Sequence, residues 1–181
     1  AVVMHDVDGQ AGSQGARNED QSTGEVYRRA FAFAREGSEP PVPSDTDRLP
    51  ALLCKVHVAG RGWADWTSAG VVAGSPQHGS QVEAVRLLLV DAPPGVGISY
   101  RAHTANIGWM DWVTSDAVAG TTGESRRLEA IQLRLVNAPP SWHCRYRAYV
   151  HDRGWLDWVE DGGVAGTVGE SRPSYAFQFE I

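Results

Sequence analysis

The sequence lacks the features that define several large classes of protein. No apolar run approaches the ~20 residues that a membrane-spanning helix needs. Aspartate and glutamate (22) outnumber lysine and arginine (16), which gives a formal net charge of −6 at pH 7, and no basic cluster stands out. We therefore expect no membrane span and no nucleic-acid partner.

Recognisable catalytic and metal-binding patterns are missing as well. The chain has no Gly-x-Ser-x-Gly segment, and its six histidines do not show His-x-x-x-His spacing. The segment Asp6-x-Asp8-Gly9 begins like a calcium loop, but the remaining ligands of that pattern are absent. We therefore expect a protein that is not an enzyme and that holds neither a cofactor nor a metal ion.

The chain does contain one segment written three times at a spacing of 46 residues. Its clearest part is Gly-Trp-x-Asp-Trp, which occupies residues 62–66, 108–112 and 154–158. A period that holds through loops as well as apolar runs indicates a repeat architecture. Each unit is too small to bury its own apolar face, so the three should share one core.

Within a unit, the pattern predicts strands and glycine turns. In the second unit, residues 99–104 alternate as a half-buried strand, 109–114 form a short strand, and 128–136 form the longest strand. Because no segment has helical period, we predict an all-β fold, a closed pseudo-threefold array of three 46-residue repeats. A β-prism with one small sheet per repeat is the first choice, and a β-trefoil is the alternative.

These patterns predict a three-repeat domain over residues 51–181, with units at about 51–90, 97–136 and 143–181. Residues 1–50 differ from the units, and the proline-rich stretch 36–50 is typical of an extended linker. The first 50 residues only faintly echo the repeat. They are either a decayed partial repeat or an extra strand with an arm.

A carboxylate stands at the head of the long strand in two units, as Glu83 and Glu129, and Tyr175 replaces it in the third. A buried carboxylate needs partners, which glycine-turn amides or an arginine would supply. We expect it to pin its own loop rather than to act in catalysis. His57 and His103 share one repeat position with a tyrosine of the third unit, which favours packing or hydrogen bonding over a general base.

Cysteine is scarce, with only Cys54 and Cys144. Cys54 falls at the repeat position of Tyr100 and Tyr146, and Cys144 lies two residues before Tyr146 on the equivalent strand. Two residues along a strand keep the same face, and the first and third repeats become neighbours if the array closes. We expect a disulfide between Cys54 and Cys144, which would place the protein outside the cytoplasm. Two separate buried thiols are the alternative.

The paired tryptophans are the candidate binding residues. Trp109 and Trp112 are three residues apart, so in a regular strand they would point to opposite faces, one into the core and one toward solvent. An exposed indole beside a carboxylate suits a sugar ring. The alternative places both tryptophans in the core. The candidate ligand-binding residues are Trp63, Asp65, Trp66, Trp109, Asp111, Trp112, Trp155, Asp157 and Trp158.

At Gly-Trp-x-x-Trp, followed by Ala-Gly-Thr-x-Gly and Leu-Glu-Ala-Ile, the chain resembles the ChW family, the clostridial hydrophobic repeats with a conserved tryptophan. The resemblance extends over residues 52–181 and is closest in the second unit, which alone keeps the whole pattern. Such repeats are associated with extracellular proteins of Gram-positive bacteria and have been proposed to bind cell-surface polymers or other proteins.

The resemblance implies a secreted bacterial protein that binds a cell-surface polymer or another protein. Together with the tryptophan pairs and their aspartates, it favours a module that recognises a glycan or cell-wall polymer at three equivalent sites. Because the second unit alone keeps the whole pattern, we expect it to bind most tightly. The alternative is an extracellular module for protein–protein interaction or self-assembly. The chain begins at Ala1 rather than at Met, a start that fits a processed secreted protein and equally a chain trimmed at that point.

Overall fold

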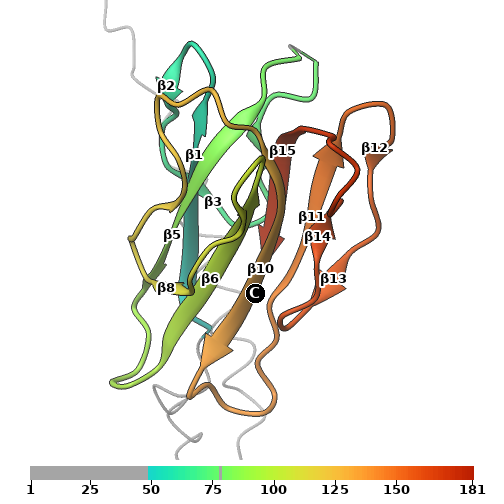
Figure 1. The fold of residues 1–181 in the computed structure, drawn as a ribbon. Coiled ribbons are helices and arrows are strands. Elements are labelled where there is room, and N and C mark those ends of the chain that lie inside the picture. Colours follow the sequence, from blue (N-terminus) through green and yellow to red (C-terminus); the bar gives the residue numbers. More distant parts are fainter. Residues whose placement is uncertain (1–48, 78) are drawn as a thin grey trace, which may run out of the picture. The chain divides into compact units, whose positions relative to one another are not determined.

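The computed structural model describes residues 49–77 and 79–181. These residues belong to one compact unit, Pro43–Ile181. Every regular element in the described residues is a β-strand, so the predicted all-β fold is confirmed (Figure 1). The predicted arm, linker and possible decayed repeat over residues 1–50 lie outside the described residues, apart from Leu49 and Pro50.

Each repeat is built on one antiparallel hairpin of two long strands. The hairpins are β1 (Ala51–Val58) with β5 (Val82–Val90), β6 (Gly97–Thr104) with β10 (Leu128–Val136), and β11 (Arg145–Val150) with β15 (Ser174–Glu180). Two-residue strands flank the first long strand of each repeat. They are β2 (Gly62–Trp63) and β3 (Thr67–Ser68), β7 (Gly108–Trp109) and β8 (Val113–Thr114), and β12 (Gly154–Trp155) and β13 (Val159–Glu160).

The remaining short strands cross from one repeat to another. They are β4 (Ala73–Gly74), β9 (Ala119–Gly120) and β14 (Ala165–Gly166). Strand β9 pairs with β5 of the first repeat, β14 with β10 of the second, and β4 with β15 of the third. Three separate five-stranded sheets result, and each contains four strands of one repeat and one strand of another.

Further hydrogen bonds join the repeats in the same way at all three junctions. The backbone N–H of Asp116 donates to the Leu87 carbonyl, that of Gly162 to Leu133, and that of Gly70 to Phe179, each at 2.7 Å. A side chain from the neighbouring sheet donates to the carbonyl of the same loop residue. These side-chain bonds run from Arg86 to Asp116, from Gln132 to Gly162 and from Gln178 to Gly70.

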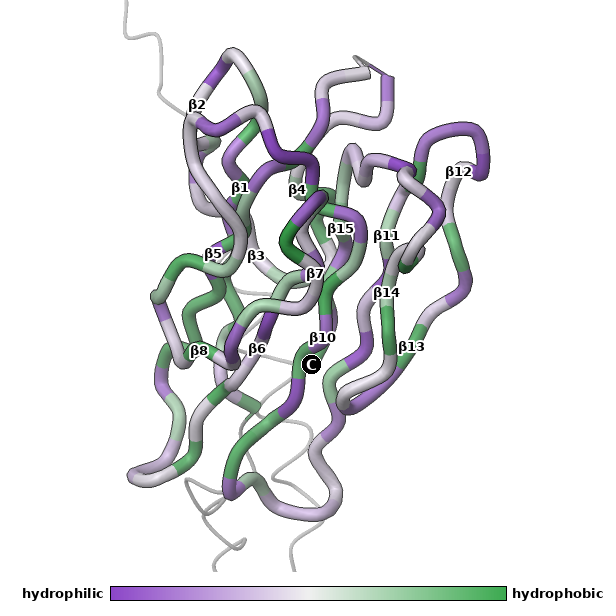
Figure 2. Tube along the Cα trace, in the orientation of Figure 1, coloured by the Kyte–Doolittle hydropathy of each residue, from purple (hydrophilic) through white to green (hydrophobic). Residues whose placement is uncertain are grey.

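The shared core lies between the inward faces of the long strands. Burial alternates along them, as polar and apolar residues do in Figure 2, and the buried cluster draws on all three repeats. The Tyr100 hydroxyl accepts a hydrogen bond from Leu87 N at 3.0 Å, and the Tyr146 hydroxyl accepts one from Leu133 N at 2.8 Å. Burial is the main cause that raises the pKa of both tyrosines to about 12. These hydroxyls therefore satisfy strand groups inside the core.

The predicted disulfide between Cys54 and Cys144 is wrong, because both residues are free, buried thiols. Cys54 Sγ lies 3.1 Å from Thr67 Oγ1, and Cys144 Sγ donates to Asp161 Oδ1 at 3.3 Å. Each thiol thus faces a partner within its own repeat. A shared strand face is not sufficient for a bridge, which also needs the two Cβ atoms within about 4.5 Å.

The thiols should be countable and unreactive. We expect two titratable thiols in unfolded protein that has never been reduced. The folded protein should react slowly with a thiol reagent at pH 8, because burial raises the pKa of both cysteines, that of Cys144 to about 12. A count of zero thiols in the unfolded, unreduced chain would contradict the structure.

The crossing strands require glycine at their second residue. A Cβ on Gly120 would collide with the Glu83 carbonyl oxygen and lie 2.8 Å from Ala84 Cα, and φ at this residue is +110°. We expect Gly120→Ala to lower the free energy of unfolding by about 2–4 kcal/mol. Gly123→Ala is the matched control, because φ is also positive there but no atom lies within 4 Å of the added Cβ. The control should cost about 1 kcal/mol, and equal losses in urea denaturation would contradict the packing argument.

Candidate functional site

The two tryptophans of each pair lie on the outward side of their sheet, so the prediction that they point to opposite faces is wrong. In the first repeat, strand β2 ends at Trp63, and residues 64–66 form no regular structure before β3 begins. The alternation of a regular strand therefore does not apply to Trp66. None of the six paired tryptophans belongs to the buried cluster, and Trp66 is 37% exposed. The alternative that places both indoles in the core is also wrong.

A cation from the first long strand lies against both indoles of each pair. The Lys55 ammonium is 5.3 Å from the ring centre of Trp63 and 4.8 Å from that of Trp66. In the second repeat, Arg101 lies 4.7 Å and 4.8 Å from its two indoles, and in the third, Arg147 lies 4.6 Å from each. Contacts of this kind stabilise by about 0.5–2 kcal/mol. Each cation therefore fixes two indoles to the sheet.

Sequence reasoning missed these cations, although a signal was present. Lys55, Arg101 and Arg147 recur at the 46-residue spacing, on positions that alternate with core residues. A basic side chain that recurs at the same outward position of each repeat indicates a recurring contact on that face of the sheet. In this structure the contact is with the tryptophan pair.

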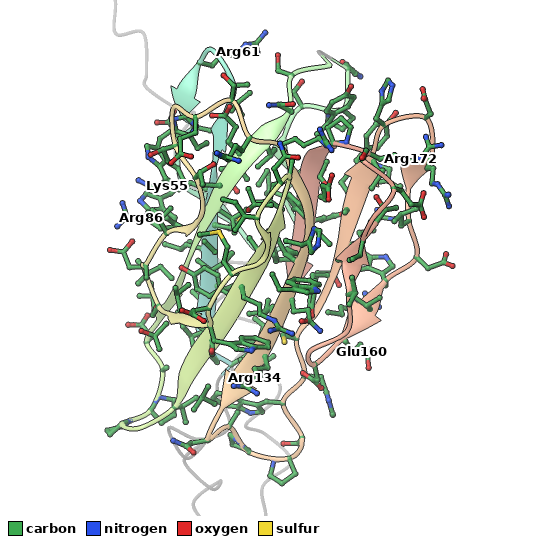
Figure 3. All side chains as sticks on the ribbon, in the orientation of Figure 1. Lys55, Arg61, Arg86, Arg134, Glu160 and Arg172 are labelled. Carbon is green, nitrogen blue, oxygen red and sulfur yellow. The ribbon has the colours of Figure 1, made fainter. Side chains whose placement is uncertain are left out.

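A second cation approaches each pair from a different strand position. Arg86 lies 5.9 Å from Trp63, Arg134 lies 4.2 Å from Trp112, and Arg145 lies 5.0 Å from Trp158. Figure 3 shows Arg86 near Lys55 on the outer side of the first sheet. Arg86 and Arg145 form ion pairs with Asp116 and Glu180. Arg134 forms no ion pair or hydrogen bond with any described residue, so the second site differs from the other two in charge.

The first tryptophan of each pair also packs against a ring on the first long strand of its repeat. The rings of His57 and Trp63 meet edge to face with 5.4 Å between centres, and His103 with Trp109 repeats this at 5.3 Å. His57 Nδ1 lies 3.0 Å from Glu83 Oε2, and Glu83 is 2% exposed. The prediction that this carboxylate has a structural partner is confirmed, although histidine had not been expected in that role.

The same contacts vary in the other repeats. His103 Nδ1 lies 3.0 Å from Glu129 Oε2, and Arg127 donates to the other oxygen of Glu129 at 2.7 Å. In the third repeat, Tyr149 replaces the histidine and contacts Trp155 with 5.5 Å between ring centres. Thus a ring always supports the first indole, whether or not a carboxylate lies behind it.

The aspartate of each motif is exposed and unengaged. The side chains of Asp65, Asp111 and Asp157 form no hydrogen bond or ion pair with any described residue. The paired indoles likewise donate no N–H hydrogen bond within the described part of the chain. Each site therefore presents fixed aromatic rings together with unused N–H donors and a carboxylate acceptor.

Two surface hollows adjoin these sites. One of about 220 Å³ lies beside the first pair and is lined by Arg61, Trp63 and Ser75 among others. The other, of about 380 Å³, lies at the end of the second repeat and is lined by Arg134, Trp142, His143 and Asp161 among others. Among the described residues there is no cluster of three or more side chains able to hold a metal ion, and no helix able to cross a membrane.

A protein-family sequence model described as "Clostridial hydrophobic W" matches residues 57–91, 103–137 and 149–181. The matched segments make up more than half of the chain. The chain belongs to this ChW family. Each ChW match begins within the first long strand of a repeat and ends at the close of the second long strand of the same repeat. The three predicted tandem repeats are therefore confirmed. Comparisons with curated proteins and with solved structures found no match.

The central cation should stabilise the tryptophan pair. We expect Arg101→Met, which keeps the aliphatic stem, to lower the free energy of unfolding by about 1–2 kcal/mol and to change tryptophan fluorescence. Arg126→Met is the control, because the one ion-pair partner of Arg126 among the described residues is the exposed Glu124. It should cost under about 0.5 kcal/mol. Equal costs in urea denaturation, with unchanged fluorescence in both variants, would show that the cation does not hold the indoles.

Proposed function

We propose that this protein is a secreted bacterial binding module that recognises a carbohydrate or cell-wall polymer through three equivalent Gly-Trp-x-Asp-Trp sites. The observation that carries the proposal is the free aspartate beside each fixed tryptophan pair. Outside the core, each repeat offers unengaged N–H donors and carboxylate oxygens next to aromatic rings. Sugar rings combine hydroxyl groups with apolar C–H faces, so this set of groups suits them.

Rigid placement of the indoles favours binding. Each tryptophan of the second pair has a guanidinium within 4.8 Å of its ring centre, and Trp109 also meets His103 edge to face. Side chains that are already ordered lose little conformational entropy when a ligand arrives. Less of the interaction energy with a ligand is therefore offset by the entropy cost of ordering the tryptophans.

The arrangement of the repeats supports multivalent binding. The same pairing joins the second repeat to the first, the third to the second and the first to the third. This cyclic exchange supports a closed pseudo-threefold array. The separate sheet of each repeat favours a β-prism over a β-trefoil. In such an array three weak sites engage one polymer, and avidity raises the overall affinity well above that of one site.

A second candidate function is protein–protein interaction or self-assembly outside the cell. Equivalent valines just before each crossing strand favour it, because Val72, Val118 and Val164 are 37%, 41% and 41% exposed. An apolar residue repeated on the surface would suit a protein partner or a second copy. Concentration-dependent mass in size-exclusion chromatography would favour this candidate over glycan binding.

The aspartates should matter for binding and little for folding. We expect Asp111→Ala to change the free energy of unfolding by less than about 1 kcal/mol, because the side chain is exposed and unpaired. Replacing Asp65, Asp111 and Asp157 together should abolish retention on the glycans that wild-type protein binds on an array. Glu124→Ala, an exposed carboxylate in a different loop, should leave retention unchanged. Normal retention by the triple variant would overturn the assignment of the site.

A further inference from the structure

The hollow of about 380 Å³ at the end of the second repeat has a chemistry that the repeat pattern does not explain. It lies where β10 ends and the chain passes toward β11, and Arg134 stands on that end of β10 (Figure 3). Pro139, Pro140 and Trp142 contribute apolar walls, and Trp142 is only 8% exposed. A volume of this size falls within the range of small-ligand pockets.

The first repeat provides an internal comparison. Moving 46 residues back replaces the four distinctive lining residues with small or apolar ones. Arg134, Trp142, His143 and Asp161 correspond to Leu88, Val96, Gly97 and Ser115. The connecting Ala-Pro-Pro segment is the same in both linkers. The same linker therefore forms in the first repeat with small or apolar residues at these four positions. The charged and aromatic residues of the second linker are not needed to form the turn.

Arg134 and the acid in the lining of the hollow do not pair with each other. The only acid in its lining is Asp161, and both of its oxygens are engaged. Oδ2 lies 2.9 Å from His143 Nδ1, and Oδ1 accepts from Cys144 N at 3.1 Å. Burial alone would raise the pKa of Asp161, but the hydrogen bonds from His143 and Cys144 hold it below its usual value. Asp161 thus bonds to the residues that lead into β11 and forms no ion pair with Arg134.

Arg134 is free to bind an anion. Arg134 is exposed and lies over the Trp112 ring without an ion pair or hydrogen bond to any described residue, whereas Arg86 and Arg145 at the other two sites pair with carboxylates. The Trp142 indole N–H also forms no hydrogen bond with a described residue. A guanidinium fork binds a carboxylate or phosphate through two parallel hydrogen bonds. Arg134 lines the hollow and also lies 4.2 Å from the centre of the Trp112 ring, so this one side chain connects the hollow to the second tryptophan pair.

We propose that this hollow is a subsite for the acidic unit of an anionic polysaccharide, with Arg134 binding the carboxylate or phosphate and the Trp142–proline wall packing against the unit that carries it. The subsite deepens the glycan-binding function proposed above and rests on it. It also sets the second repeat apart from the first, since Leu88 replaces the arginine there. The repeats then share a general sugar site, and one of them selects for acid.

The test compares one sugar chain in two charge states. Oligogalacturonate and its methyl ester differ only in the carboxylate, and an oligo(glycerol phosphate) serves as the phosphate arm. Wild-type protein and two variants, Arg134→Leu and Arg126→Leu, are titrated with all three probes. Arg134→Leu installs the residue of the first repeat, and Arg126→Leu makes the same change in net charge at a distant ion pair.

Wild-type protein should bind at least one acidic probe about tenfold more tightly than the ester, because hydrogen bonds to charged groups carry about that factor. Arg134→Leu should remove this preference, so that the acid and the ester bind with similar affinity. Arg126→Leu should bind as wild type does. The indole N–H resonance of Trp142, assigned with Trp142→Phe, should shift on titration of the acidic probe. Whether oligogalacturonate or oligo(glycerol phosphate) shows the effect identifies the acidic group.

Two results would overturn the subsite. Equal affinity of wild-type protein for acid and ester does so, and so does an acid preference that survives in Arg134→Leu. If the ester or other neutral glycans still bind in either case, and replacing Asp65, Asp111 and Asp157 abolishes that binding, the glycan-binding function stands without the subsite. If no probe and no array glycan binds, both proposals fail together.

Discussion

The fold depends on the close backbone contact between each crossing strand and the sheet it completes. At Gly74, Gly120 and Gly166 the chain runs against a neighbouring sheet so closely that a Cβ would lie within 3 Å of backbone atoms. This contact supplies the fifth strand of each sheet and brings a carbonyl of the loop just before that strand within reach of Arg86, Gln132 or Gln178. The core can be shared only because these junctions bring the three sheets together.

The same geometry leaves the tryptophans outside. The inward faces of the hairpins are filled by side chains from three repeats, and the largest of these are tyrosine and phenylalanine. The paired indoles instead lie on the outward faces, where Lys55, Arg101 and Arg147 hold them. The outward surface of each repeat thus carries ordered indoles with unused N–H groups next to an aspartate that no described residue engages. The family match establishes that the segment carrying them is the repeating unit.

Strands with strong local signals were predicted well. The expected strand over 128–136 coincides with β10, and the expected strand over 99–104 lies within β6. The segment 109–114 was predicted as one strand and is instead two, because residues 110–112 leave the ladder between β7 and β8. That departure places Trp109 and Trp112 around one guanidinium. Local alternation carries no information about such a turn. The same alternation predicted a disulfide between Cys54 and Cys144, which was wrong because the two sulfurs contact different partners.

The sequence alone determined the repeat, the all-β class and the candidate residues, because a 46-residue period and strand alternation are properties of neighbouring residues. Tertiary structure decided which repeat completes which sheet, what faces each thiol, and where the indoles and their cations meet. It also brought Arg134 of β10 to one hollow with Asp161 of the following repeat. These contacts join residues far apart in the chain, and their distances depend on how three sheets pack together, which no local pattern encodes.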